Sequence, residues 1–426
     1  MHLVHCLLLL LAGLLALSHG QQPPEHRSKG HISHAHPEAP AAGEGSPSLK
    51  ITPGNTVFAL RLYHLIASQP PAGNIFLSPL SISAAYAMLS LGVRSPSRTQ
   101  ILEGLGFNLT EVPESDIHRG FQHLLHMLHL PGDRLEVRVG SALFLSPELQ
   151  LLPRFQNGSS TFYESRFFRT NFLDSVGTTQ LISNHVKNET RGKIVNLVSE
   201  LRPDTVMVLV NYIYFKALWE KPFTRLIATT QDFYVDVATT VKVPMMLQDA
   251  RYHWYLHDRY LPCSVLRLDY QGKATALFIL PNRGKMKQVE EVLTPQMLTR
   301  WSNLLQKRYF YRKLKLYIPK FSISGSYKLE QILPKLGITD LFSQPADLSN
   351  ITQQLNLQLS SSLHKAVLEV GESGAQAAAA TSHSFTFLSR DRHQALWFNR
   401  PFLVAIFSTN TQSILFLRKV VNPTKP

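Results

Sequence analysis

The sequence predicts an α+β fold, because helix and strand patterns are mixed along the chain without a repeating strand-helix-strand order. Residues 81–91 and 294–308 carry helix start signals, including a proline close to the first turn. Residues 206–217 are apolar and rich in β-branched side chains, as expected of a buried strand. Residues 402–407 and 413–421 have the pattern of a β-hairpin.

Residues 1–20 form a predicted signal peptide. They contain no Lys, Arg, Asp or Glu, and an apolar run from Cys6 to Leu17 ends in Ser18-His19-Gly20. We expect cleavage after Gly20 and secretion to the extracellular space. No later apolar stretch reaches about 18 residues, so we expect no membrane span.

Residues 21–48 are rich in His, Pro, Ala, Gly and Glu without apolar periodicity, and we interpret them as a disordered N-terminal tail. Four histidines of this tail are possible weak metal ligands, but no rigid scaffold fixes a coordination geometry there: His26, His31, His34 and His36. We therefore predict no metal and no cofactor. Residues 49–426 show no linker or internal repeat, which indicates a single domain.

The chain has 426 residues, 44% of them hydrophobic, and a formal net charge of +14. It contains two cysteines, and removal of the signal peptide leaves Cys263 alone. A secreted chain without an internal disulfide depends on a large hydrophobic core. Cys263 is either a small buried hydrophobic residue or a site for mixed disulfides.

Four Asn-x-Ser/Thr sequons predict glycosylation of an extracellular protein, at Asn108, Asn157, Asn188 and Asn350. Local enzyme motifs are absent: the chain has no G-x-S-x-G, Walker loop, G-x-G-x-x-G, H-E-x-x-H or C-x-x-C. A catalytic triad scattered in sequence stays open at this point, because 18 histidines are present.

An alanine-rich arm near the C-terminus is the most unusual segment. Every residue from Ala377 to Ser382 is small, and Gly374 provides a backbone pivot ahead of them. In a strand, the side chains of Ala375, Ala377, Ala379 and Thr381 would share one face and could fit between existing strands. Residues 385–390 that follow are largely apolar between polar neighbours, as in a protease bait. The alternative is a helical segment or linker, because Ala favours helices.

From about Pro53 to the C-terminus, the chain resembles the serpin family. The resemblance rests on motifs in the family's order: Asn74-Ile75-Phe76-Leu77-Ser78-Pro79-Leu80-Ser81-Ile82, Thr190-Arg191-Gly192-Lys193-Ile194, Val210-Asn211, Phe215-Lys216-Ala217-Leu218-Trp219, His364-Lys365-Ala366-Val367-Leu368 and Phe398-Asn399-Arg400-Pro401-Phe402. It implies a serpin fold with three β-sheets, a shell of helices and an exposed reactive-centre loop at about residues 372–397.

The resemblance implies a suicide trap for a serine protease. The target would cleave the bait bond Leu388-Ser389 and form a covalent acyl complex, and residues 374–388 would then insert into the central sheet, a strand insertion of the kind known for serpin loops. Leu388 favours a chymotrypsin-like target, with a kallikrein-like target as the second class. The chain would be an inhibitor rather than an enzyme.

Further site residues follow from the same resemblance. The hinge residues would be Glu372, Gly374, Ala375, Ala377, Ala378, Ala379 and Ala380. The shutter cluster, where the central sheet parts, would be Ser78, Ser81, Asn211 and His364. Trp219 would lie at the breach, near the top of the opening.

A second predicted site binds polyanions. If residues 311–318 form a strand, Lys313 and Lys315 share one face, and Leu314 lies on the other. The basic strip (Lys307, Arg308, Arg312, Lys313 and Lys315) would bind heparin or a related glycosaminoglycan. The alternative is that Lys307 and Arg308 only complement a helix dipole and the lysines are solvated. Nucleic acid would satisfy the same electrostatics, but a secreted chain should not meet it.

We expect a monomer whose partners are a serine protease and heparin. The alternative function is a non-inhibitory serpin that serves as a hormone carrier or a heparin-binding signalling protein. Bulky or charged residues at the inward positions of the arm would favour that alternative, and the small residues Ala375, Ala377 and Ala379 disfavour it.

Overall fold

The computed structural model describes residues 45–70, 73–130, 135–195, 197–198, 201–320, 323–343, 347–354, 357–369 and 394–425. These residues all belong to one compact unit. The predicted signal peptide, almost all of the predicted tail and most of the predicted reactive-centre loop lie outside the described residues.

The helices gather mainly in the first half of the chain. They are α2 (Pro47–Ala67), α3 (Pro79–Ser90), α4 (Ser97–Gly104), α5 (Glu114–His129), α6 (Pro153–Tyr163), α7 (Ser175–Glu189), α8 (Met286–Glu291) and α9 (Pro295–Leu304). Short 3-10 helices follow at η1 (Arg308–Phe310), η2 (Leu329–Gln331), η3 (Leu333–Leu336) and η4 (Asp340–Phe342). Within the described residues, no helix is both long enough and apolar enough to cross a bilayer.

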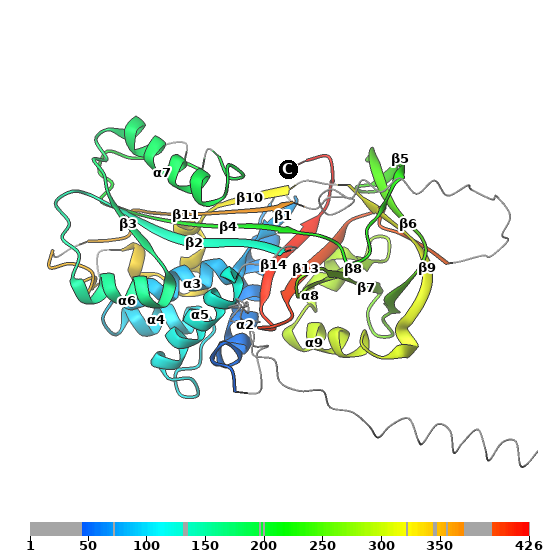
Figure 1. Ribbon diagram of the computed structural model, residues 1–426, viewed down its shortest axis with the longest axis horizontal. Coiled ribbons are helices and arrows are strands. Elements are labelled where there is room, and N and C mark those ends of the chain that lie inside the picture. Colours follow the sequence, from blue (N-terminus) through cyan, green and yellow to red (C-terminus); the bar gives the residue numbers. More distant parts are fainter. Residues whose placement is uncertain are drawn as a thin grey trace, which may run out of the picture. The chain divides into compact units, whose positions relative to one another are not determined.

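A five-stranded sheet forms the centre of the molecule. In spatial order it contains β10 (Ile323–Lys328), β11 (Ser361–Glu369), β4 (Met207–Ala217), β2 (Leu135–Leu145) and β3 (Arg166–Arg169). The pairs β10–β11 and β2–β4 are antiparallel, whereas β4–β11 and β2–β3 are parallel. Figure 1 shows α7 on one face of this sheet and α3, α5 and α6 on the other.

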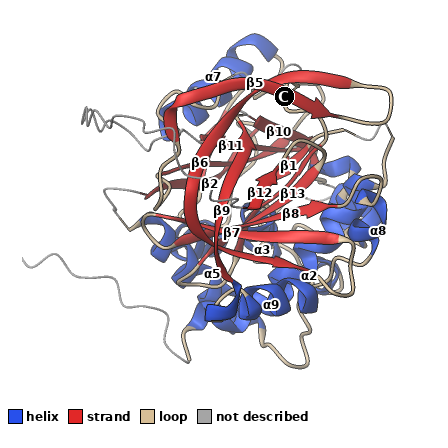
Figure 2. Ribbon diagram, turned by 90° about the vertical axis from the view of Figure 1, so that its right-hand side faces the viewer, coloured by secondary structure: helices blue, strands red, loops and turns tan. Residues whose placement is uncertain are grey.

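The second sheet has nine strands. Its order is β1 (Ile75–Leu77), β14 (Ile414–Val420), β13 (Phe402–Ser408), β8 (Ala274–Pro281), β7 (Cys263–Tyr270), β6 (Thr240–His257), β9 (Tyr311–Pro319) and β12 (Gln394–Trp397), with β5 (Thr224–Tyr234) also paired to β6. In Figure 2, α7 lies to one side of the strands and α2, α5 and α9 to the other.

The long strand β6 explains why hydrogen bonding joins these nine strands. One part of β6 pairs with β5 and the other with β7, while β9 pairs along both parts. The register with β9 shifts between Gln248 and Arg251, and Ala250 has a positive φ of 46°. Such an irregularity bends a strand, so β6 serves two sheet regions. Two of the three predicted sheets are therefore continuous through β6.

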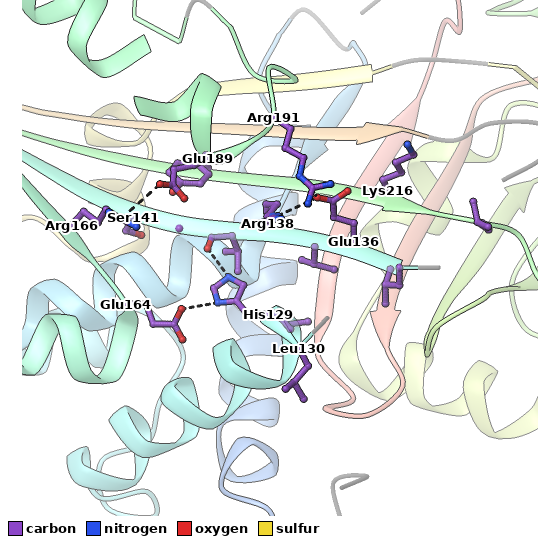
Figure 3. Close-up of a pocket in the computed structure, with 17 residues that line it drawn as sticks. His129, Leu130, Glu136, Arg138, Ser141, Glu164, Arg166, Glu189, Arg191 and Lys216 are labelled. Carbon is purple, nitrogen blue, oxygen red and sulfur yellow. Dashed lines mark hydrogen bonds and ion pairs between the residues drawn. The ribbon is translucent and has the colours of Figure 1, made fainter. Parts of the chain in front are cut away.

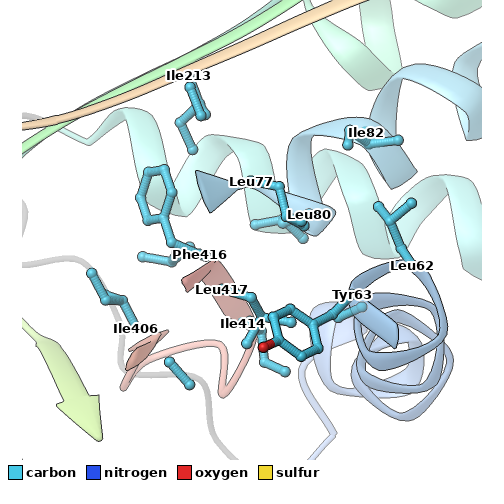
Figure 4. Close-up of a cluster of buried hydrophobic side chains, with 14 of the residues drawn as sticks. Leu62, Tyr63, Leu77, Leu80, Ile82, Ile213, Ile406, Ile414, Phe416 and Leu417 are labelled. Atoms are coloured by element: carbon cyan, nitrogen blue, oxygen red, sulfur yellow. The ribbon is translucent and has the colours of Figure 1, made fainter. Parts of the chain in front are cut away.

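The core lies between the two sheets and α3. All twelve residues of α3 are buried, as expected for a helix that is apolar around its whole circumference. Figure 4 shows Leu80 and Ile82 from this helix in one cluster with Phe416 and Leu417 of β14 and Ile213 of β4. The β13–β14 hairpin therefore packs against the helix that contains the predicted shutter residue Ser81 and is capped by another, Ser78.

The predicted elements agree with the structure except at some ends. The predicted helix 81–91, strand 206–217 and C-terminal hairpin correspond to α3, β4 and β13–β14. The predicted helix 294–308 is too long, because α9 ends at Leu304 and the chain turns there before β9 pairs with β6. Helix α2 begins at Pro47, and Ser48 is buried, with its hydroxyl 3.1 Å from Nδ1 of His123.

Candidate functional site

The described parts of the chain on either side of the predicted reactive-centre loop are strands. Before the loop, β11 ends at Glu369, and after it β12 begins at Gln394 and pairs in parallel with β9. Phe398 extends the attachment of β12 to β9, because its N–H donates to the carbonyl of Tyr317 at 2.9 Å. The predicted hinge and bait residues lie outside the described residues: Glu372, Gly374, Ala375, Ala377, Ala378, Ala379, Ala380, Leu388 and Ser389.

Strands β4 and β11 lie directly beside each other. Their parallel register runs over nine pairs from Val208↔Ser361 to Lys216↔Glu369, which we call the β4–β11 seam. A segment that turned back from the end of β11 into this seam would run antiparallel to both strands. One parallel pairing would be replaced by two antiparallel ones, which are slightly more stable for each residue.

The structure brings the four predicted shutter residues together at this seam. Asn211 of β4 is the Cα partner of His364 in β11, and its side-chain carbonyl lies 2.6 Å from Nδ1 of His364. The same oxygen accepts from the hydroxyl of Ser81 at 2.9 Å. The Asn211 amide donates to the carbonyl of Ser81 at 3.0 Å, with Gly140 and Ser141 of β2 also within reach.

The N-terminus of α3 holds the other half of the cluster. Ser78 is the N-cap, with its hydroxyl accepting from the N–H of Ser81, and Pro79 is the first helical residue. The backbone N–H of Ser78 donates to Nε2 of His364 at 3.3 Å. One cluster therefore links α3, β2, β4 and β11, and all four predicted side chains are buried.

These contacts assign the protonation of His364. Nε2 accepts from the N–H of Ser78, so the ring proton is on Nδ1 and points to the carbonyl oxygen of Asn211. Complete burial lowers the pKa of His364 to about 3. The imidazole is therefore neutral at ordinary pH, and a second proton would face a backbone N–H.

Two further residues strengthen the connection between α3 and β11. The hydroxyl of Tyr86 donates to Oγ of Ser362 at 2.7 Å, and burial strongly raises the pKa of Tyr86. The N–H of Ser362 donates to the carboxylate of Glu330 at 3.0 Å. The sequence interpretation missed this pair, because no local pattern connects positions 276 residues apart.

Trp219, the predicted breach residue, lies two residues after the end of β4 and is buried. Its ring stacks on Tyr270 with centroids 4.2 Å apart, and it meets Phe223 edge-on. An isolated bridge to Tyr270 fixes its backbone. The residue therefore ties the end of β4 to β7, at the end of the seam near Lys216 and Glu369.

The basic strip lies at the surface. Lys307, Arg308, Arg312 and Lys313 are exposed, whereas Lys315 is half-buried and forms an ion pair with Asp249 at 3.2 Å. As predicted, Leu314, Leu316 and Ile318 are buried on the opposite face of β9. Because α9 ends at Leu304, Lys307 and Arg308 lie just beyond its last turn and not within it.

Aromatic rings adjoin this basic strip and were not predicted. The Arg312 guanidinium lies 5.3 Å from the ring centroid of exposed Tyr309. Tyr252 of β6 stacks on Tyr311 at 5.3 Å, and Lys221 lies over the Tyr311 ring at 5.1 Å. Flat rings beside cations can support sugar rings while the cations bind sulfate groups.

The sequons and the cysteine occupy different environments. Asn108, Asn157 and Asn188 are exposed, and Asn350 is half-buried. Cys263 is a free cysteine that is fully buried, and burial raises the pKa of its thiol to about 12. Its environment supports the buried-hydrophobic interpretation. No group of three possible metal ligands occurs among the described residues.

Comparison with known proteins identifies the architecture. The family model described as Serpin (serine protease inhibitor) matches residues 53–423. Kallistatin from Homo sapiens is 67% identical over 428 residues, which covers 100% of both chains. The crystal structure of human glycosylated kallistatin has a TM-score of 0.84 at 68% identity, covering 90% of this chain and 100% of that chain.

The crystal structure of cleaved kallistatin complexed with heparin has a TM-score of 0.74 at 69% identity, covering 77% of this chain and 96% of that chain. From the sequence alone, residues 101–108 and 253–260, with residues 43–48 of the tail, predict a similarity to kallistatin. The predicted family and the predicted similarity to kallistatin are both confirmed, and the chain belongs to the serpin family.

Proposed function

We propose that this chain is a secreted inhibitor that traps serine proteases covalently. The observation that carries the proposal is the β4–β11 seam, a parallel pairing whose strand β11 ends at Glu369, a few residues before the alanine-rich arm in the sequence. After cleavage at Leu388-Ser389, residues 374–388 would enter the seam and pair with both strands. The small side chains at Ala375, Ala377 and Ala379 would meet little steric resistance there.

Incubation with chymotrypsin followed by a denaturing gel tests this proposal. We expect a heat-stable adduct that contains one inhibitor chain and one protease chain, since each molecule would be consumed once. Leu388→Glu should abolish the adduct with chymotrypsin, because the specificity pocket of that protease is apolar. Cleavage of the unaltered chain without any adduct would instead support a non-inhibitory carrier.

We propose that the basic strip binds heparin. The support is the exposure of Lys307, Arg308, Arg312 and Lys313, together with the heparin complex of cleaved kallistatin. Lys307→Gln with Lys313→Gln should elute from immobilised heparin at lower salt, because fewer ionic contacts form. Lys242→Gln is a matched control, because Lys242 is an exposed, ion-paired lysine of another strand segment. Equal elution of the double variant and the unaltered chain would contradict the proposal.

We further propose that residues 1–20 are removed on secretion and that a tail, which ends before α2 at Pro47 rather than at residue 48 because Ser48 is buried, precedes a single, monomeric serpin domain. Surface positions at Asn108, Asn157, Asn188 and Asn350 are compatible with attached glycans. The mature protein should begin at Gln21, and enzymatic deglycosylation should lower its apparent mass. N-terminal sequencing and mass spectrometry of secreted protein test these points.

A further inference from the structure

A cavity of about 640 Å³ lies along the edge of β2, between the end of α5 and the residues that follow α7 (Figure 3). Strand β3 pairs with β2 only from Ala142 to Leu145. Within the described residues, the earlier part of β2 therefore has a strand neighbour only on the β4 side. Through this open edge of β2, a small molecule can enter the cavity from solvent.

Two arginines contact one carboxylate on one wall of this cavity, and a lysine lies on the neighbouring strand. Nε of Arg138 and Nε of Arg191 each lie 3.2 Å from the same oxygen of Glu136. Lys216 is the cross-strand partner of Glu136, so its side chain leaves the sheet on the same face. Figure 3 shows Arg191, Glu136, Arg138 and Lys216 as one group. Three positive charges and one negative charge leave a local charge of +2.

The other charged side chains of the cavity lie close to one another in pairs. Arg166 pairs with Glu189 at 3.7 Å, and Nδ1 of His129 lies 2.8 Å from the carboxylate of Glu164. Nε2 of His129 also lies 2.9 Å from the carbonyl of Val139, where it occupies part of the open edge of β2. The excess of arginine and lysine over carboxylates therefore lies on the wall around Glu136.

The two arginines of that wall can bind a further acceptor. In the described contacts, both reach Glu136 through Nε, and these contacts use neither arginine's terminal amino groups. Arg191 lies just after α7 with a positive φ of 51°, a conformation that costs energy for a residue with a side chain. Guanidinium forks bind the tetrahedral oxyanions of phosphate and sulfate with two parallel hydrogen bonds.

We propose that this cavity binds a small dianion of the phosphate or sulfate monoester class. Its anionic group would contact Arg138, Arg191 and Lys216, which together with Glu136 carry the matching charge of +2. Its organic part would cover the apolar lining residues Leu130 and Leu135. The volume lies in the range of small-ligand sites, roughly 300–1,000 Å³.

Titration calorimetry with phenyl phosphate tests the proposal without any protease. We expect phenyl phosphate to bind at least about tenfold more tightly than benzoate, which has one negative charge, and inorganic phosphate to compete with it. Arg138→Gln and Arg191→Gln should each weaken phenyl phosphate binding by about tenfold or more. Both variants should retain the protease adduct and heparin affinity, which separates this site from the trap and from the basic strip.

Matched controls keep the test specific. Lys242→Gln removes an exposed, ion-paired cation elsewhere, and Lys313→Gln removes one from the basic strip; neither should change phenyl phosphate binding. The proposal is overturned if millimolar phenyl phosphate gives no binding heat. It is equally overturned if Arg138→Gln binds as tightly as the unaltered chain, or if a control loses affinity to the same degree.

Discussion

Acidification should weaken the native fold through His364. Its imidazole is neutral in the shutter cluster, where Nε2 accepts from Ser78 and Nδ1 donates to Asn211. The pKa of His364 is lowered from 6.5 to about 3 because the ring is buried. In the unfolded chain the ring takes up a proton below about pH 6.5, whereas in the folded chain it stays neutral. Its stabilising contribution is therefore present above the unfolded pKa and is lost as the pH falls from there toward about 3.

The size of this effect follows from the two pKa values. Each pH unit between them changes the free energy of unfolding by about 1.4 kcal/mol. Between about pH 7.5 and about pH 5, the unfolded ring becomes almost fully protonated and the folded ring does not. The free energy of unfolding should therefore fall by roughly 2 kcal/mol from this residue alone.

A comparison with His364→Asn isolates the contribution. The variant cannot titrate at this position, while His253, whose pKa is also lowered to about 4, is present in both chains. Urea unfolding of each uncleaved protein at the two pH values gives the decrease in its free energy of unfolding on acidification. The unaltered chain should lose roughly 2 kcal/mol more than the variant. Equal losses would show that His364 does not remain neutral in the folded state, and the reasoning would fail.

Three other predictions concern the arm, α3 and the cysteine. Ala379→Arg should turn the inhibitor into a substrate, with chymotrypsin cleavage but no heat-stable adduct on a denaturing gel, because a charged side chain opposes strand insertion; an undiminished adduct would contradict insertion. Tyr86→Phe should cost about 1–2 kcal/mol in urea unfolding, because the Ser362 hydroxyl loses a buried partner, whereas Tyr309→Phe at the surface should have no effect. Cys263 should resist iodoacetamide in the folded protein and react in urea, as mass spectrometry would show, because burial raises its thiol pKa to about 12 and blocks access.

Sequence patterns predict where helices and strands lie better than they predict which distant residues come into contact. The apolar run of β4 and the alternation in β9 were sufficient to place both strands and the buried face of β9. The end of α9 was not predictable, because no Gly or Pro marks Leu304 and the pairing of β9 with β6 decides where the chain turns. Ser78 and His364 are separated by 286 residues, so only resemblance to a family could group them. The cavity beside β2 was missed for the same reason, since Glu136, Arg191 and Lys216 meet only through the topology.

The position of the shutter cluster explains how an uninserted state can persist beside a more favourable one. The β4–β11 seam must separate before the arm can enter, and His364↔Asn211 lies within it. Separation breaks the bond between His364 and Asn211 in a site without access to solvent, so both polar groups lose a partner before a new strand supplies others. That loss raises the barrier to opening, whereas the two antiparallel pairings formed afterwards lower the final free energy. In the proposed trap, the cluster therefore controls the rate of insertion, and the arm determines whether insertion can be completed.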